Sequence, residues 1–175
     1  TLLALDDISF TIAPGEVLGV VGESGAGKSL TGAAIIGLLE PPGRIAGGEI
    51  LLVGRRIDNL PYEQLRAIRG RQIGAIFQDP LTSLNPLYTI GRQLIETIRT
   101  HLPVSEDEAR ARAIRLLQET GIPAAEARID QYPHQFSGGM RQRVVIALAL
   151  AAAPTLIVAG EPSTARDGAS QAQGS

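Results

Sequence analysis

Short apolar runs separated by turns dominate the first half of the chain. Residues 5–12 alternate apolar and polar side chains, residues 16–21 are almost entirely apolar, and residues 49–53 and 71–78 contain two further apolar stretches. Alternation is typical of a half-buried strand, and a short continuous run is typical of a buried one. We therefore predict four strands, with a turn at residues 13–15 joining the first two.

Helical periodicity replaces these short runs in the second half. Apolar residues recur every three or four positions over 89–102 and over 109–120, and residues 140–152 are rich in alanine, leucine and valine. This spacing predicts two helices with one buried stripe each, followed by a largely buried helix. Ser105 and Glu108 have the spacing of a capping box, which predicts the start of the second helix.

The remaining segments complete a pattern of alternating strands and helices. Residues 30–39 and 61–68 predict two shorter helices, and residues 155–159 predict a last buried strand. At the start of the helix over 109–120, Glu106 and Arg110 stand four residues apart, as do Glu108 and Arg112, so we expect pairs on a solvent-exposed face. Strands that alternate with helices are typical of an α/β fold.

Composition limits the classes of protein to which the chain can belong. Its 175 residues, 44% hydrophobic and 19% charged, are ordinary for one globular domain. The net charge of −2 and the scattered arginines give no support for binding nucleic acid. The absence of cysteine excludes disulfides and thiolate metal sites. The longest apolar run, 144–153, is about half of the ~20 residues that a membrane-spanning helix needs.

One glycine-rich stretch between a predicted strand and a predicted helix carries a phosphate-binding pattern. It fits G-x-x-x-x-G-K-[ST], in which backbone N–H groups surround phosphates, the lysine reaches the β- and γ-phosphates, and the serine hydroxyl binds Mg²⁺. The alternative is a plain glycine-rich turn before a helix. We predict a site for ATP and Mg²⁺, with Ser29 as a metal ligand. Its residues are Gly22, Glu23, Ser24, Gly25, Ala26, Gly27, Lys28 and Ser29.

A second glycine motif precedes the alanine-rich helix. Ser137, Gly138 and Gly139 stand at the predicted helix start, where backbone N–H groups are free to bind an anion. Taken alone, the motif is more typical of an ordinary helix cap followed by flexible residues than of an anion site. Its neighbours over 132–143, Tyr-Pro-His-Gln-Phe-Ser-Gly-Gly-Met-Arg-Gln-Arg, give it more meaning.

Together, the two motifs strongly resemble those of the ATP-binding subunits of ABC transporters. The resemblance runs from Ala4 to Thr164 and is closest to the dipeptide and oligopeptide importers, through the segment 77–86, Phe-Gln-Asp-Pro-Leu-Thr-Ser-Leu-Asn-Pro. It implies a motor subunit that binds and hydrolyses ATP to import di- or oligopeptides. Such a subunit is peripheral, at the cytoplasmic face of the bacterial inner membrane.

The resemblance also implies roles and partners. Gln78 would sense the metal and the γ-phosphate, and Glu161 would orient or deprotonate the attacking water. The Ser137 motif would close over ATP held by a second ATP-binding subunit, arranged head to tail. The loop after Gln78 would contact transmembrane permease subunits, which a peptide-binding receptor serves, and no nucleic acid is involved.

The implied fold is a P-loop NTPase-like α/β fold, with a mostly parallel sheet, an antiparallel β opening and a helical subdomain. We expect the P-loop core and β subdomain over 1–78, and the Q-loop and helical subdomain over 79–136. Residues 137–167 would return the signature helix and a Walker B-like strand to the core. Residues 168–175 are small and polar, which predicts a disordered tail.

Several departures from the family pattern change these expectations. Gly160 stands where the family has the aspartate that supports Mg²⁺. An adenine-stacking aromatic residue would precede Thr1, and an inner strand and a switch histidine would follow Ser175. We therefore expect a fragment with an incomplete sheet, marginal stability and negligible ATPase activity alone. Alternatives are a catalytically inactive nucleotide-binding module and, disfavoured by the segment 77–86, a soluble ABC ATPase outside transport.

Overall fold

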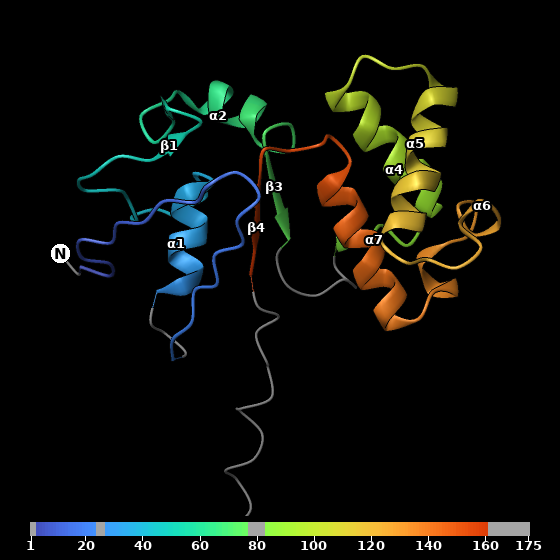
Figure 1. Ribbon diagram of the computed structural model, residues 1–175, viewed down its shortest axis with the longest axis horizontal. Helices are drawn as coiled ribbons and strands as arrows, with labels where there is room; N and C mark the ends of the chain where they lie inside the picture. The colour runs from blue at the N-terminus through green and yellow to red at the C-terminus, as the bar shows by residue number, and fades with distance from the viewer. Residues whose placement is uncertain (1–2, 24–26, 77–82, 161–175) are drawn as a thin grey trace, which may run out of the picture. The chain divides into compact units, whose positions relative to one another are not determined.

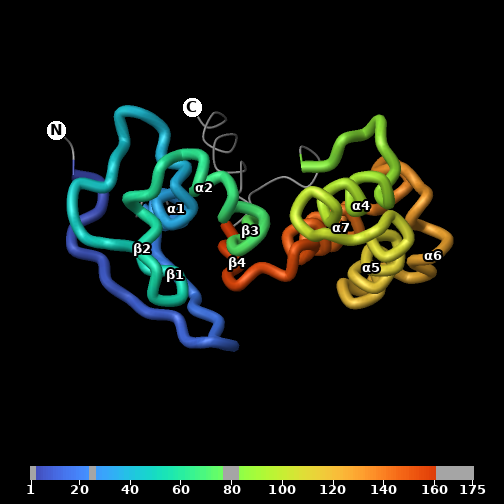
Figure 2. Tube along the Cα trace, turned by 90° about the horizontal axis from the view of Figure 1, so that it is seen from above, coloured from blue at the N-terminus to red at the C-terminus, as the bar shows by residue number. Residues whose placement is uncertain are grey.

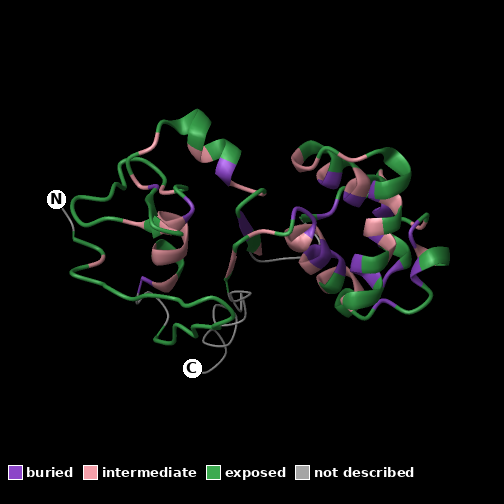
Figure 3. Cartoon of the chain, turned by 45° about the horizontal axis from the view of Figure 1, so that its top comes forward, coloured by how far each residue is buried: buried purple, intermediate pink, exposed green. Residues whose placement is uncertain are grey.

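The computed structural model describes residues 3–23, 27–76 and 83–160. The chain divides into two compact units, Thr1–Arg69 (the first unit) and Gly70–Ser175 (the second unit) (Figure 1). Burial differs between them, because buried positions gather in the helices of the second unit while most of the first unit is exposed (Figure 3). In the described part of the chain, no helix has the length and apolar character needed to cross a membrane.

Two short helices and a small hairpin make up the regular structure of the first unit. The hairpin is antiparallel, with Leu51 opposite Arg56, and its two turn residues, Val53 and Gly54, have φ of 50° and 76°. Positive φ at both central residues is the requirement of a two-residue type I′ turn, which glycine meets without strain and valine does not. The elements are α1 (Lys28–Ile35), β1 (Leu51–Leu52), β2 (Arg55–Arg56) and α2 (Tyr62–Ile68).

A carboxylate with a largely covered side chain reinforces this short hairpin. Asp58, whose side chain is 6% exposed, accepts a hydrogen bond from the Ile50 amide at 2.8 Å and from Arg56 Nε at 3.0 Å. The hydrogen bonds from Arg56 lower the pKa of Asp58, against the effect of burial, which raises it. Side-chain contacts therefore stabilise a hairpin whose ladder is only two residues long.

Along the sequence, the helices of the second unit stand between two strands that pair in parallel. The strands pair from Ile73 with Leu156 to Ile76 with Ala159. Ser105 caps α5 through the predicted capping box, because its hydroxyl accepts from the Glu108 amide while the Glu108 carboxylate accepts from the Ser105 amide. The elements are β3 (Ile73–Ile76), α4 (Ile90–His101), α5 (Glu106–Glu119), α6 (Ala125–Arg128), a 3₁₀ turn (Pro133–Gln135), α7 (Gly138–Leu150) and β4 (Leu156–Ala159).

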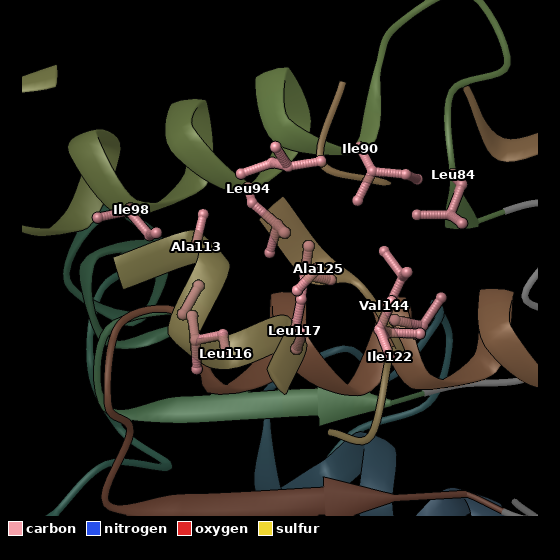
Figure 4. Packing of buried hydrophobic residues seen from close by; sticks show 14 of the residues in the cluster. Leu84, Ile90, Leu94, Ile98, Ala113, Leu116, Leu117, Ile122, Ala125 and Val144 are labelled. Atoms are coloured by element: carbon pink, nitrogen blue, oxygen red, sulfur yellow. The ribbon is translucent and has the colours of Figure 1, made fainter. Parts of the chain in front are cut away.

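The hydrophobic core of the second unit lies between α4, α5 and α7. Most of its side chains come from the helices that the sequence predicts and point toward one another from facing helices (Figure 4), while Leu84, Ile122, Ala125, Ile129 and Phe136 come from other segments. Removing this apolar area from water is the main source of stability for the unit. Fully buried members include Ile90, Leu94, Ile98, Leu117, Ile129 and Val144.

The strands predicted over 5–12 and 16–21 are wrong. Neither range contains a strand, and Val17 and Val21 are 94% and 90% exposed. A strand needs a backbone partner, and the described residues form only the pairs β1–β2 and β3–β4. The apolar pattern is that of a buried strand, but no neighbouring strand pairs with it among the described residues.

Other predicted boundaries shift for local reasons. The helix expected over 30–39 begins two residues earlier, at Lys28, and ends at Ile35, because Gly37 turns into the left-handed region with φ of 67°. The strand expected over 49–53 is reduced to Leu51–Leu52 by the turn that follows it. The disordered tail expected over 168–175 lies outside the described residues.

The ion pair predicted between Glu106 and Arg110 is also wrong. Arg110 instead binds Asp130 at 2.7 Å, and Glu106 binds Arg99 at 3.3 Å. The hydrogen bonds from Arg110 lower the pKa of Asp130. The i,i+4 spacing allows a pair within one helix, but carboxylates and arginines of neighbouring segments compete for the same groups.

Candidate functional site

The Lys28 side chain folds back over the glycine-rich loop. Its Nζ donates to the carbonyl oxygens of Gly22 at 2.5 Å and Glu23 at 2.8 Å. An ammonium group has three N–H donors, so these two bonds fix the amine and leave one donor for another acceptor. The predicted residues Ser24, Gly25 and Ala26 lie outside the described residues. Among the described residues, Lys28 therefore contacts Gly22 and Glu23, the first two residues of the predicted phosphate-binding loop.

Gly27 joins the loop to α1 in a way that only glycine permits. Its φ is 82°, and a Cβ at this position would collide with Leu5 Cδ2. Its carbonyl accepts from the Thr31 amide at 2.9 Å and from the Thr31 hydroxyl at 3.0 Å, which starts the helix. The contact with Leu5 was not predicted, because no local pattern links residues so far apart.

The start of α1 suits an anion. Gly27 is the N-cap residue and has no side chain to accept from the first amides of the helix. Those N–H groups have no partner within the helix, and the helix dipole makes this end positive. Lys28 adds a full positive charge at the same end. The described residues therefore fit the phosphates of a nucleotide by charge and by the number of free donors.

The fit to Mg²⁺ is less complete. Ser29 is exposed in the first turn of α1, where its hydroxyl is accessible to a metal. The second predicted metal residue, Gln78, lies outside the described residues. Over the ranges 3–23, 27–76 and 83–160, no group of three histidines or carboxylates is placed to hold an ion. Ser29 is thus the one predicted metal ligand whose surroundings are described.

Gly160 stands at the carboxyl end of β4, where the resemblance implies an aspartate. Its amide donates to the Ile76 carbonyl at 2.9 Å and so continues the ladder between the two parallel strands. Because β3 and β4 are parallel, their carboxyl ends lie at one edge. Gln78 and Glu161, which follow these strands in the sequence, lie outside the described residues. Gly160 brings no carboxylate to this edge.

The Ser137 motif begins α7 in the second unit, as predicted. The Ser137 hydroxyl accepts from the Met140 amide at 3.2 Å and caps the helix. Gly138 and Gly139 are exposed, and a Cβ on either would meet no atom within 4 Å. The second unit itself therefore has no steric need for glycine at these two positions.

Alanine at Gly138 or Gly139 is expected to leave the fold intact. Alanine favours a helix over glycine by roughly 1 kcal/mol, so the free energy of unfolding should stay unchanged or rise by up to about that amount. Thermal and urea unfolding of the two variants would measure this.

Gly74→Ala provides a matched contrast. A Cβ at Gly74 would lie 2.5 Å from Ile157 Cδ1 and 2.6 Å from the Ala149 carbonyl oxygen, so this variant should be destabilised. A loss of stability in Gly138→Ala or Gly139→Ala equal to that of Gly74→Ala would contradict the open surroundings of the motif.

Comparison with known proteins supplies an independent finding. A family model described as ABC transporter matches residues 5–164. The oligopeptide transport ATP-binding protein OppD of Bacillus subtilis (strain 168) is 50% identical over 171 residues, which are 97% of this chain and 48% of OppD. The dipeptide transport ATP-binding protein DppD of Escherichia coli (strain K12) is 47% identical over 170 residues, 97% of this chain and 52% of DppD.

Solved structures agree with these sequence matches. A dimeric ATP-binding cassette in a post-hydrolysis state, bound to ADP and Pi, has a TM-score of 0.76 and 32% identity to this chain. The match covers 94% of this chain and 68% of the cassette. The chain spans about half the length of the curated relatives it matches.

Proposed function

We propose, from the premise that the chain belongs to the ABC transporter family, that it is the ATP-binding motor part of a di- or oligopeptide importer. The mixed α/β, P-loop NTPase-like fold expected from the sequence is confirmed by the likeness to solved cassettes, and the small open sheets agree with the predicted incomplete sheet. The names of the relatives support peptide import as the transport process.

One observation carries the nucleotide-binding part of the proposal. Lys28 is fixed by the Gly22 and Glu23 carbonyls, with one donor left over, at the positive end of α1. We infer that this donor and the first amides of α1 hold the phosphates of ATP. The likeness to a cassette bound to ADP and Pi supports a nucleotide as the ligand.

The remaining roles follow from the family. Ser29 and Gln78 would bind Mg²⁺, and Glu161 would orient or deprotonate water. When bound, MgATP supplies the phosphoryl group whose transfer to water drives the motor. In this proposal Lys28 and the first amides of α1 would fix the phosphates, and the carboxylate of Glu161 would act on the water.

The open surroundings of Gly138 and Gly139 support a contact from outside the subunit. We propose that the Ser137 motif faces the nucleotide of a second ATP-binding subunit, in a head-to-tail dimer. Permease subunits would bind the loop after Gln78, and a peptide receptor would act through them. This arrangement would locate the chain at the cytoplasmic face of the bacterial inner membrane, as a peripheral subunit.

Gly160 favours a second candidate function, nucleotide binding without hydrolysis. Phosphoryl transfer depends on a correctly held cation, and this position contributes no carboxylate. We therefore expect the chain to bind ATP while turning it over negligibly. Restored Mg²⁺-dependent hydrolysis in Gly160→Asp would favour a damaged enzyme. ATP binding without hydrolysis, in both the unsubstituted chain and Gly160→Asp, would favour a binding module.

Titration with a fluorescent ATP analogue tests the nucleotide site. Binding should saturate, and ATP and ADP should displace the analogue while adenosine should not, because the proposed contacts are to phosphates. Failure of ATP to displace the analogue, or equal displacement by adenosine, would contradict the proposed function.

The transport role needs a separate measurement. The chain should co-purify with the permease subunits of a peptide importer from detergent-solubilised membranes, and ATP should change the amount retained. Nucleotide binding without any such association would contradict the peptide-import role. It would leave the proposed ATP site unaffected.

A further inference from the structure

The helix that carries Lys28 has little buried surface to hold it in place. α1 has eight residues, none of them fully buried. Helices of this length are marginal in water unless tertiary contacts stabilise them. The contacts at the two ends of α1 therefore matter more than they would for a helix with a buried apolar stripe. Leu5 against Gly27 is the contact at the loop end.

The other end of α1 closes in a Schellman motif. Gly37 has φ of 67°, its amide donates to the Ala34 carbonyl at 3.1 Å, and the Leu38 amide donates to the Ala33 carbonyl at 2.8 Å. These bonds satisfy two of the last carbonyls of the helix. The carbonyls of Ile36 and Gly37 remain for partners outside α1.

Arg69, the residue at which α2 ends, donates to both of these carbonyls. Its Nε lies 2.7 Å from the Ile36 oxygen, and its Nη2 donates to the Gly37 oxygen. Leu65, one turn earlier, approaches Gly37 so closely that a Cβ there would lie 3.1 Å from Leu65 Cδ1. In the first unit, α2 lies near the C-terminal end of α1 (Figure 1), and Figure 2 shows the same region from above.

Charge and shape both make this contact specific. The C-terminal end of a helix carries partial negative charge, which the Arg69 guanidinium meets directly. The guanidinium is planar and offers two parallel donors, whereas a lysine would offer a single point of charge. Its Cζ also lies 5.7 Å from the centre of the Tyr62 ring, which further limits its orientation.

We propose that Arg69 is a positioning residue for the phosphate loop and acts through α1. The helix bears Lys28 at its start and the Arg69 contacts at its end. Losing those contacts would let α1 fray and shift, so that the first amides and Lys28 no longer converge on the phosphates. This inference rests on the proposed binding of nucleotide by the Gly22–Ser29 loop.

The test combines nucleotide affinity with local hydrogen exchange on the full chain. Arg69→Ala should weaken binding of the fluorescent ATP analogue roughly tenfold, within the range typical of coupled sites. The amides of residues 31–38 should exchange faster, while those of α4, α5 and α7 stay protected. Arg69→Lys keeps the positive charge but not the two parallel N–H donors. It should therefore retain part of the nucleotide affinity and part of the protection from exchange that Arg69→Ala loses.

Arg66→Ala is the matched control. Arg66 is an exposed arginine in the last turn of the same helix, α2, so its removal takes away the same charge without the two carbonyl contacts. It should change the affinity less than twofold. An unchanged affinity in Arg69→Ala, or an equal loss in Arg66→Ala, would overturn the role of Arg69 and leave the nucleotide site standing. Absence of nucleotide binding by the unsubstituted chain would overturn both proposals.

Discussion

Replacing Lys28 with alanine should weaken ATP binding by on the order of 100-fold. Removing one partner of a desolvated, hydrogen-bonded charge pair costs about 2–5 kcal/mol, and each 1.4 kcal/mol is a factor of ten in affinity. The substitution also leaves the Gly22 and Glu23 carbonyls without the donor that holds them at 2.5 and 2.8 Å. The loss should therefore be equally large with Mg²⁺ and with EDTA.

Ser29→Ala separates the metal from the phosphates. Its hydroxyl is proposed to bind only Mg²⁺, so this variant should lose affinity in Mg²⁺ and keep it in EDTA. Arg66→Ala removes a positive charge from the same unit and should leave the affinity for ATP unchanged both in Mg²⁺ and in EDTA. If Lys28→Ala bound the fluorescent ATP analogue within threefold of the unsubstituted chain, the loop would not be the phosphate site.

The largest expected effect on stability comes from Leu117→Ala. Leu117 is fully buried on α5 between α4 and α7, and truncating a buried leucine costs about 2–5 kcal/mol in lost burial and cavity formation. Whole domains are stable by only about 5–15 kcal/mol, so a large part of the free energy of unfolding should disappear. Urea unfolding followed by far-ultraviolet circular dichroism would measure it.

Leu87→Ala is the control of the same chemistry. Leu87 is 78% exposed in the same unit, so its truncation should change the free energy of unfolding by less than about 0.5 kcal/mol. Similar losses in the two variants would mean that the cluster around Leu117 is not the core of the second unit.

Helices were more predictable than strands for a physical reason. The stripe of Ile90, Leu94 and Ile98 is a local pattern, and the helix it predicts is confirmed with Thr89 as its cap. The run over 16–21 has an equally clear strand pattern but forms no strand, because strand formation depends on a partner elsewhere in the chain. Periodicity describes which face is apolar, not what covers it.

The candidate site shows the same division. The sequence motif alone predicts Lys28, Gly27 and the cap at Ser137, since each acts within a few residues of itself. Leu5 against Gly27 and Arg69 on the end of α1 have no local signature, because their contacts join segments that only the fold brings together. Local motifs therefore predict residues for which we propose nucleotide binding, but they do not predict the residues that position the loop.

The parallel pairing of β3 with β4 also bears on how the second unit folds. Ile73 pairs with Leu156, so the strands close a loop that contains the helices from α4 to α7. The helices gain most of their contacts from nearby sequence, whereas the sheet gains nothing until the whole loop is closed. We therefore expect the pairing of β3 with β4 to form later than the helices and to limit the rate at which this unit folds.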